Sequence, residues 1–251
     1  MSKYEVSSLV NINYVNNVPK VVFVCWFGSF TKYSKLMPPN RLNAFKSLVN
    51  NINVPVILIT DFNYKYFEVD TDPVHEMFKY LSGNHKSDYM RSYLLHHYGG
   101  GYHDIKQRSL GWENEWDKDN WTDDNNIWIY GRQENKESAI GYQPGMKHIQ
   151  KEFAKLATMG WVICRPRTEY TRELLQNLNS KLDECKDKLI LYPAQNPGGY
   201  YANNPFDNAN IDSYPLRWLE MMGEFSHLLM LKYQSHIKFG LPDAEKSRRY
   251  K

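Results

Sequence analysis

Short apolar runs of strand length alternate with helical patterns through the first hundred residues of the chain. Residues 21–27 and 56–60 are continuous apolar runs, a pattern typical of strands that are buried on both faces of a sheet. Between them, prolines at 38 and 39 precede a helical pattern over about residues 41–50, and residues 73–81 form another. This alternation predicts an α/β fold whose central sheet begins with parallel strands.

A helix, a run of glycines and a short strand follow one another between residues 85 and 106. Leu94, Leu95 and Tyr98 form an apolar stripe that seats the predicted helix on a core. The glycines at 99–101 end that helix and let the backbone pass close to a neighbouring segment. The strand that follows ends at Asp104, so a carboxylate stands at its tip.

Polar and aromatic residues stand where each of the three predicted strands ends. The first strand ends in Trp26-Phe27-Gly28, the second reaches Asp61, and the third reaches Asp104. Ligands of such sheets bind beyond the carboxyl ends of the strands. Asp88 and Arg91 lie three residues apart and share a helix face. The sequence therefore predicts an anion and metal site at this edge.

The second half of the chain has a mixed pattern. We expect a strand over 126–131, a helix over 146–159, a short strand over 161–165, and a helix that Thr168 or Thr171 caps and that runs to Cys185. Residues 193–205 form a loop rich in Pro and Gly, which we interpret as a lid over the side of the site that would take a second substrate, the acceptor. Residues 214 to about 236 are expected to form a final helix or helix pair.

The central run resembles the signature of glycosyltransferases with an Asp-x-Asp motif, in family 32 and the capsular polysaccharide synthesis group. The resemblance rests on Ser87-Asp88-x-x-Arg91, on Tyr98-Gly99-Gly100-Gly101-Tyr102 and on Asp104. Residues 19–28, which end in Trp-Phe-Gly, and residues 54–61 resemble the first two strands of that family. Tyr214 to Trp218, with Gly223 and His227, resembles the C-terminal segment of a viral or microbial branch.

The resemblance implies a single domain with a GT-A-like, Rossmann-related mixed sheet flanked by helices. Residues 1–110 would form the nucleotide-sugar donor half, and 111–251 the acceptor half with the C-terminal helices. The implied activity is transfer of a sugar from a UDP- or GDP-sugar to a hydroxyl group of a glycan or glycoprotein, with retention of configuration. The implied cofactor is a divalent metal, Mn²⁺ or Mg²⁺.

The resemblance also implies the roles of individual residues. The catalytic set is Asp88, Arg91 and Asp104. The donor-binding set adds residues on the first strand, the helix and the glycine run: Trp26, Phe27, Gly28, Lys86, Ser87, Gly100, Gly101, Tyr102 and Lys106. The competing structural interpretations are a surface ion pair for Asp88 and Arg91, and core aromatic rings for Trp26 and Phe27.

Lys106 stands where the family has the second Asp of its motif, and three interpretations compete. In the first, Lys106 faces the diphosphate and replaces part of the metal's charge. In the second, Asp104 holds the metal together with a C-terminal histidine, His227 or His236. In the third, Lys106 pairs with Asp104 and the site is inactive. The extent of the resemblance favours the second interpretation. The structural alternative for His227 is a core histidine, and His103 is expected to face away from Asp104.

Composition narrows the class of protein. The 251 residues are 42% hydrophobic and 24% charged, as in ordinary globular proteins, and the net charge of +3 argues against nucleic acid as a partner. No apolar run reaches transmembrane length, no signal segment is visible, and three scattered cysteines do not form a disulfide framework. We therefore expect a cytoplasmic protein, in the host cytosol if the source is viral.

Two other functions stay open at this point. Lys106 is also compatible with a non-catalytic nucleotide- or glycan-binding protein whose Asp-x-Asp motif has degenerated. A nucleotide-sugar hydrolase would use the same donor site with water in place of the acceptor. An aromatic content of 15% suits a protein that stacks sugars, although a coding bias would produce it equally well.

Overall fold

A six-stranded mixed sheet forms the centre of the molecule in the computed structural model, which describes residues 12–28, 37–137, 140, 147–195 and 213–244. The strand order is β4-β3-β5-β7-β6-β8. The strands are β3 (Val22–Trp26), β4 (Val56–Thr60), β5 (Gly100–His103), β6 (Ile129–Gln133), β7 (Ala157–Cys164) and β8 (Ile237–Phe239). A separate hairpin joins β1 (Tyr14–Val15) to β2 (Val18–Pro19).

The sheet changes direction at β7. Strands β4, β3 and β5 are parallel, as the alternating pattern predicts. Strand β7 lies antiparallel to both β5 and β6, and β8 closes the sheet parallel to β6. The second half of the chain therefore completes the sheet that the first half begins, which confirms a single α/β domain with a mixed, GT-A-like sheet.

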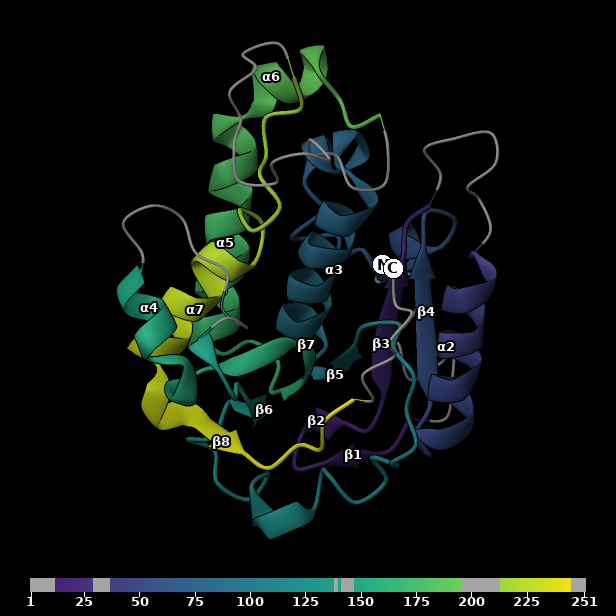
Figure 1. Cartoon of the computed structure of the whole chain (residues 1–251), viewed down its shortest axis with the longest axis vertical. Helices are drawn as coiled ribbons and strands as arrows, with labels where there is room; N and C mark the ends of the chain where they lie inside the picture. Colours follow the sequence, from purple (N-terminus) through teal and green to yellow (C-terminus); the bar gives the residue numbers. More distant parts are fainter. Residues whose placement is uncertain (1–11, 29–36, 138–139, 141–146, 196–212, 245–251) are drawn as a thin grey trace.

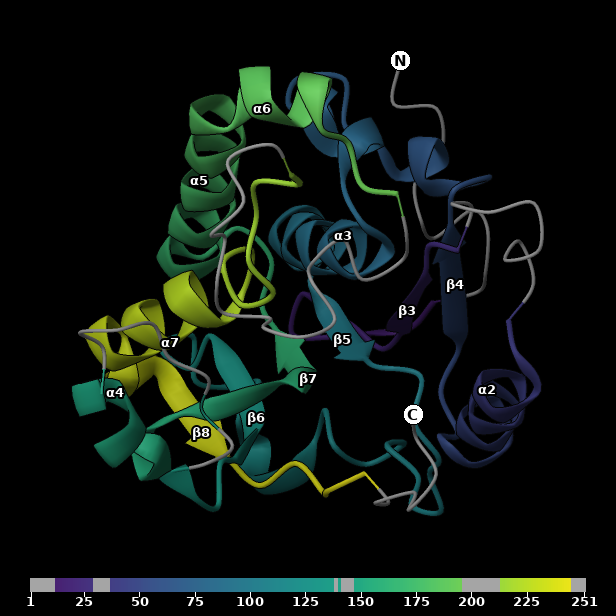
Figure 2. The same cartoon turned by 45° about the horizontal axis from the view of Figure 1, so that its top comes forward.

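Helices cover both faces of this sheet (Figures 1 and 2). The α-helices are α2 (Pro39–Asn51), α3 (Gly83–His97), α4 (Lys147–Lys151), α5 (Glu169–Glu184), α6 (Lys186–Leu191) and α7 (Gly223–Lys232). Short 3₁₀ turns are η1 (Tyr64–Phe67), η2 (Glu76–Tyr80), η3 (Lys118–Asn120), η5 (Phe153–Lys155) and η6 (Gln234–His236). Helices α3, α5 and α7 share one apolar core, and α2 packs with a tryptophan-rich loop in a second one.

Helix α3 is positioned by signals at both of its ends. The Ser82 side chain caps its start by accepting a hydrogen bond from the His85 amide at 3.2 Å. Tyr98 is its last half-helical residue, and Gly99 then takes a φ of +70°, the left-handed conformation that ends many helices. These signals place the N-terminal half of α3 near the carboxyl ends of the parallel strands.

Several predicted elements are confirmed, with small shifts of their ends. The strand over 21–27, the helix over 41–50 and the signature helix appear as β3, α2 and α3. Thr168, rather than Thr171, caps α5 by accepting a hydrogen bond from the Thr171 amide. His103 is fully buried, and its Nδ1 contacts the Asp104 backbone carbonyl rather than the carboxylate.

Other elements differ from the prediction. The helix expected over 146–159 is wrong beyond its first turns, because Ala157 to Cys164 pairs with strands on both sides. The segment 73–81 forms only a 3₁₀ turn, and the final helix is confined to α7 with a 3₁₀ turn after it. Strand β4 is an edge strand, so only its alternate residues Ile57 and Ile59 are fully buried.

Three other expectations concern the chain as a whole. None of the described helices has the length and apolar character needed to cross a membrane. All three cysteines are buried and free of disulfides. Most of the loop interpreted as an acceptor-side lid, from residue 196 onwards, lies outside the described residues.

Candidate functional site

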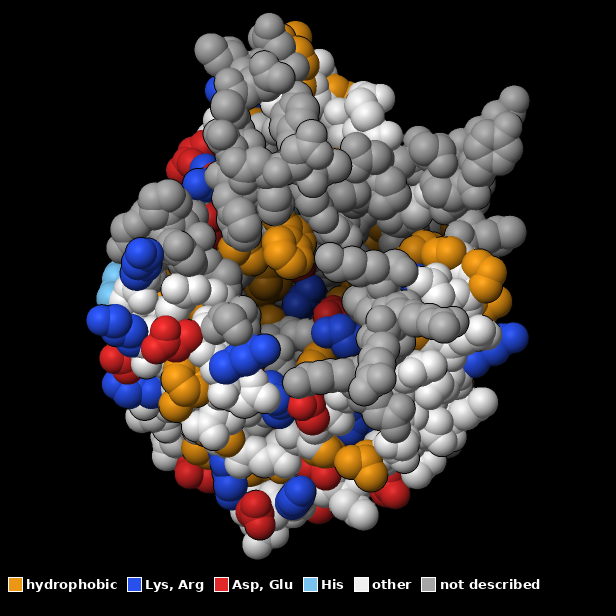
Figure 3. Space-filling model, viewed as in Figure 1, with side chains coloured by type: hydrophobic (Ala, Val, Ile, Leu, Met, Phe, Trp, Pro, Cys, Tyr) orange, Lys and Arg blue, Asp and Glu red, His pale blue; other side chains and the backbone are white. Residues whose placement is uncertain are grey.

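The predicted strand ends and the N-terminal half of α3 lie together at one edge of the sheet. Asp61 directly follows β4 and pairs with Lys86 of α3, while Asp104 directly follows β5 and lies near Arg91 of the same helix. Figure 3 shows a hollow near the centre of the molecular face drawn there, where basic and acidic side chains meet. The two contacts with α3 support the prediction that these strand ends converge.

Arg91 links the two carboxylates of the predicted catalytic set. Its Nη2 donates a hydrogen bond to Asp88 Oδ1 at 2.6 Å and lies 3.9 Å from Asp104 Oδ1. Its Nη1 donates to the Met159 backbone carbonyl of β7 at 2.6 Å, and the guanidinium lies 4.4 Å from the centre of the Tyr102 ring. The arginine is therefore fixed from several sides, unlike a partner in a loose surface ion pair.

Lys106 lies on the same side as Asp104, although both residues follow the end of β5. Its Nζ is 3.4 Å from Asp104 Oδ2 and 4.5 Å from the centre of the Trp161 ring. Both side chains of the pair keep about a quarter of their surface exposed. The Asp104 carboxylate therefore faces a cation on each side, Lys106 and Arg91, and is still partly exposed.

Gly160 of β7 makes room for this pair of charges. A Cβ atom at position 160 would lie 3.1 Å from Asp104 Oδ2 and 3.5 Å from Lys106 Nζ. The Gly160 carbonyl also accepts a hydrogen bond from the Asp104 amide at 2.7 Å. Strand β7, from the second half of the chain, thus forms one wall of the site.

The electrostatic environment gives the carboxyl groups of Asp88 and Asp104 different pKa values. Burial raises the pKa of Asp88 to about 6, with Asp104 adding to the rise and Arg91 opposing it. Burial also acts to raise the pKa of Asp104, but Lys106 and Arg91 outweigh it, and the pKa lies below its ordinary value. Asp104 is therefore the permanent anion of the site, whereas Asp88 changes its charge close to neutral pH.

Lys86 and Ser87 are held at the first turns of α3. Lys86 is buried, with its Nζ 3.0 Å from Asp61 Oδ1 and above the Phe78 ring. The Ser87 hydroxyl donates to the Gly83 backbone carbonyl at 2.9 Å. That Lys86 or Ser87 contacts the sugar donor stays a prediction.

Trp26 and Phe27 have different surroundings at the end of β3. Trp26 is half-buried, and its indole Nε1 is buried without a hydrogen-bond partner. Phe27 is 3% exposed and packs edge-on against Phe78 and Tyr64, so its contacts are those of a core residue. Gly28, also buried, follows them. The Trp26 ring packs partly against the second apolar core, and its buried Nε1 is the one side-chain polar atom among these three residues.

The glycines and the tyrosine of β5 support the site from beneath. A Cβ atom on Gly100 would lie 3.0 Å from the Pro19 carbonyl, and one on Gly101 would lie 2.9 Å from Val22. Tyr102 is buried with its ring against Arg91. Close packing explains why both positions are glycine. The described contacts do not show that either glycine or Tyr102 would touch a sugar donor.

The predicted metal ligands do not fit a metal site of the two-carboxylate kind. Mg²⁺ and Mn²⁺ prefer several oxygen ligands, whereas Asp104 lies between two cationic side chains. His227 is 9% exposed, with its pKa lowered to about 4 by burial and its Nδ1 unpartnered. Among the described residues, no group of three metal-ligating side chains contains Asp104 or His227.

Some residues of the site escaped the sequence analysis. Met159 and Gly160 carry no local signal, because the segment around them reads as a helix and reaches the site only through the pairing of β7 with β5. Trp161 lies in the strand predicted over 161–165, but its contact with Lys106 depends on the pairing of that strand with β5. Asp61 was recognisable from its place after a strand, although its pairing with Lys86 was not.

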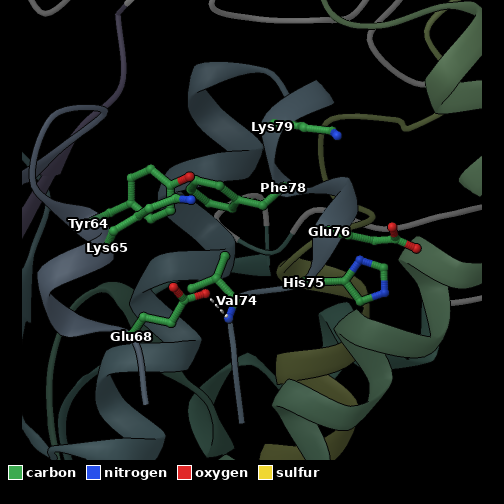
Figure 4. A pocket seen from close by; sticks show the side chains of 8 residues that line it. All are labelled: Tyr64, Lys65, Glu68, Val74, His75, Glu76, Phe78 and Lys79. Atoms are coloured by element: carbon green, nitrogen blue, oxygen red, sulfur yellow. Dashed lines mark hydrogen bonds between the residues drawn. The ribbon is translucent and has the colours of Figure 1, made fainter. Parts of the chain in front are cut away.

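A separate pocket lies between η1 and η2, and Figure 4 shows its lining. Its walls are formed by Tyr64, Lys65, Glu68, Val74, His75, Glu76, Phe78 and Lys79. Glu68 accepts a hydrogen bond from the Val74 amide at 2.9 Å, so its carboxylate is used within the pocket wall. None of the predicted site residues lines this pocket.

Comparison with known proteins supports the class of protein that the fold and site indicate. Residues 15–128 match the family model described as the glycosyltransferase sugar-binding region containing DXD motif. No curated protein and no solved structure matches the chain. The matched stretch contains β3, β4, α3 and β5 and ends before β6, so the family model covers the predicted donor region but not β7. It supports a glycosyltransferase of the GT-A type.

Proposed function

We propose that this chain transfers a sugar from a nucleoside diphosphate sugar to a hydroxyl group of a glycan or glycoprotein, with retention of configuration. The observation that carries the proposal is the Asp104 carboxylate between Lys106 and Arg91, at the carboxyl edge of a GT-A-like sheet. The family match over residues 15–128 supports the same class of reaction.

In the proposed reaction, the bond between the anomeric carbon and the diphosphate oxygen breaks, and its electron pair leaves with the diphosphate. The acceptor hydroxyl forms the new bond on the same face, and its proton passes to the leaving phosphate oxygen. Negative charge grows on the diphosphate, so cations aimed there lower the barrier. Arg91 and Lys106 supply those cations, and Asp104 holds both of them at one point.

Asp88 is assigned to the donor sugar, since its carboxylate lies one helical turn from Arg91 and hydrogen-bonds to it. Trp26 is assigned to the nucleotide because its unpartnered indole nitrogen lies at the end of β3. The C-terminal half, with its α5 and α7 helices, is assigned to the acceptor. The finer family 32 and viral or microbial assignment rests on the sequence resemblance alone.

This proposal replaces the expected Mn²⁺ or Mg²⁺ at Asp104 by the lysine. We therefore expect UDP or GDP to bind in the presence of EDTA, measured by calorimetry with both nucleotides and their common sugar conjugates. Lys106→Ala should weaken that binding about 10- to 100-fold, the effect of losing a hydrogen bond to a charged group. Lys232→Ala, which removes an exposed lysine paired with Glu173, is the matched control.

Lys106→Asp gives a second, sharper test, because it provides the second carboxylate of the motif. Nucleotide binding of this variant should become dependent on Mn²⁺. If binding to the original chain already requires metal, the role of Lys106 is wrong while the transferase proposal stands. If no nucleotide binds under any condition, the donor-site proposal itself fails.

A non-catalytic binding protein is the second candidate, and the replacement of the second Asp by Lys106 favours it. Release of UDP or GDP from the bound sugar conjugate separates the two functions. A transferase releases the nucleotide faster when acceptor glycans are added, and a hydrolase does so at the same rate without them. A binding protein retains the intact conjugate, and Asp104→Ala then affects affinity alone.

A further inference from the structure

A group of metal-ligating side chains lies at the other end of α3 from the donor site. Asp72, His96 and His97 each offer one ligand atom, and these atoms lie within 4.8 Å of one another. His96 and His97 are the last two residues of α3. Nine residues separate Asp88 from His97, which places the group about 13 Å along the helix axis from the predicted donor contacts.

The contact between His97 and Asp72 is that of two ligands facing one ion. His97 Nε2 is buried and lies 3.1 Å from Asp72 Oδ2, at ion-pair distance but without the alignment of a good hydrogen bond. Two ligands bound to the same tetrahedral zinc, each at about 2.0–2.1 Å, are themselves about 3.3 Å apart. The histidine is thus close enough to the carboxylate for both to bind one ion.

The ligands are held in place by neighbours that do not compete for the ion. His96 Nδ1 lies 3.1 Å from the Thr171 hydroxyl of α5, which orients the ring and leaves Nε2 for an ion. The Asp72 backbone carbonyl accepts a hydrogen bond from the Tyr93 hydroxyl at 2.7 Å. Outer hydrogen bonds of this kind fix the orientation of metal ligands in proteins.

The chemistry of the group selects the type of metal. Two imidazoles and one carboxylate suit Zn²⁺ and its transition-metal neighbours, whereas Mg²⁺ and Mn²⁺ favour oxygen ligands. The C-terminus of α3 adds partial negative charge, which favours a cation. Two nearby charges oppose it: Arg167, whose amide donates to the His96 carbonyl, and Arg172.

We propose that Asp72, His96 and His97 form a zinc site that ties the segment before η2 to the end of α3. Asp72 is 44% exposed, so water can fill the fourth position. The site is separate from the sugar-transfer site and does not depend on the proposed activity. It joins two segments that lie 24 residues apart in the chain.

The test is calorimetric titration of Zn²⁺ into the full chain, prepared without a histidine tag and stripped of metal by EDTA. We expect one Zn²⁺ per chain and no comparable binding of Mg²⁺. Asp72→Asn and His96→Gln should each weaken binding at least about tenfold, and Thr171→Ala should do so to a similar extent by releasing His96. Zn²⁺ at about 100 times its dissociation constant should lower the unfolded fraction about 100-fold.

Asp183→Asn is the matched control. Asp183 pairs with His75 at 3.2 Å in a two-residue contact outside the proposed site, and it is highly exposed. This variant should bind Zn²⁺ like the original chain. Asp72 is half-exposed, so Asp72→Asn keeps the test valid even if a change at the buried His97 impairs folding. Absence of Zn²⁺ binding, or binding that Asp72→Asn and His96→Gln leave unchanged, would overturn the proposal.

Discussion

The Asp88 carboxyl group combines burial with a partner one helical turn away. A buried carboxylate is disfavoured, which is why its pKa rises to about 6 despite the contact with Arg91. Asp104 escapes this rise because two cations face it. The same cluster thus contains one carboxyl group that titrates near neutral pH and one that stays ionised.

The difference between the two carboxyl groups predicts a pH profile. If the ionised form of Asp88 binds the donor sugar, kcat/KM should fall about tenfold for each pH unit below 6 and level off above it. The sign follows from the raised pKa, since protonation of Asp88 begins as the pH drops towards 6. Measurements of kcat/KM between pH 4.5 and 8, with the sugar donor identified in the nucleotide titrations, would show this acidic limb of the profile.

Asp88→Asn is the control for that profile. The amide does not ionise, so this variant should be slower and should show no limb near pH 6. A limb of the same shape in Asp88→Asn would mean that another group titrates there.

Gly160 leads to a second prediction at this scale. A methyl group at this position would displace the Asp104 carboxylate by a few tenths of an ångström and would make an ordinary van der Waals contact with the Lys106 ammonium group. Because a misplacement of 1 Å can cost about 100-fold in rate, Gly160→Ala should lower kcat/KM roughly three- to tenfold. The contacts involve the ends of side chains, so the melting temperature should change little. A large drop in melting temperature would instead assign Gly160 to the stability of β7.

Among the elements, α3 connects the site to the fold. Its N-terminal turns carry Asp88 and Arg91, and its end is fixed by Gly99, where a Cβ atom would lie 2.5 Å from the Pro166 ring. The left-handed backbone of Gly99 is also unfavourable for any residue with a side chain. The turn between α3 and β5 therefore sets the distance between Arg91 and Asp104.

Gly99→Ala should destabilise the fold by at least about 2 kcal/mol, from the left-handed conformation and the contact with Pro166. For a chain of this size, the melting temperature should fall by roughly 4–8 °C. Asn53, which follows α2, also has a left-handed backbone, with a φ of +57°. Replacing it by glycine relieves that conformation and serves as the control, with a change in stability opposite to that of Gly99→Ala. Asn53→Gly should leave the melting temperature unchanged or raise it slightly, and a similar loss in both variants would contradict the argument.

Elements with strong local signals could be predicted, and elements that depend on distant pairing could not. The apolar run of β3 and the cap of α5 at Thr168 were recognisable from a few residues. Strand β7 was predicted only over its second half, as the short strand over 161–165, because residues 157–160 have no clear alternation and join the sheet by pairing with β6. The same dependence hid the contact between Met159 and Arg91.

At the scale of the whole molecule, the fold and the site draw on different parts of the chain. The helix–glycine–strand run was enough to predict the GT-A-like class and the proximity of Asp88, Arg91 and Asp104, whereas the catalytic roles of these residues stay predictions. The charges around Asp104 were predicted only in part, since the role of Lys106 depends on how the side chains face one another. Partners that are distant in sequence, such as Asp61 and Lys86, needed the structure.

The position of β7 has a consequence for how such a chain can change over time. The family match ends at residue 128, but Met159, Gly160 and Trp161 touch the charged cluster from beyond it. Grafting residues 15–128 onto a related chain would carry Asp88, Arg91, Asp104 and Lys106 along and leave that wall behind. The charged cluster and the wall beside it are thus encoded in separate parts of the chain, so substitutions in β7 can reshape the surroundings of the cluster and leave its charged residues unchanged.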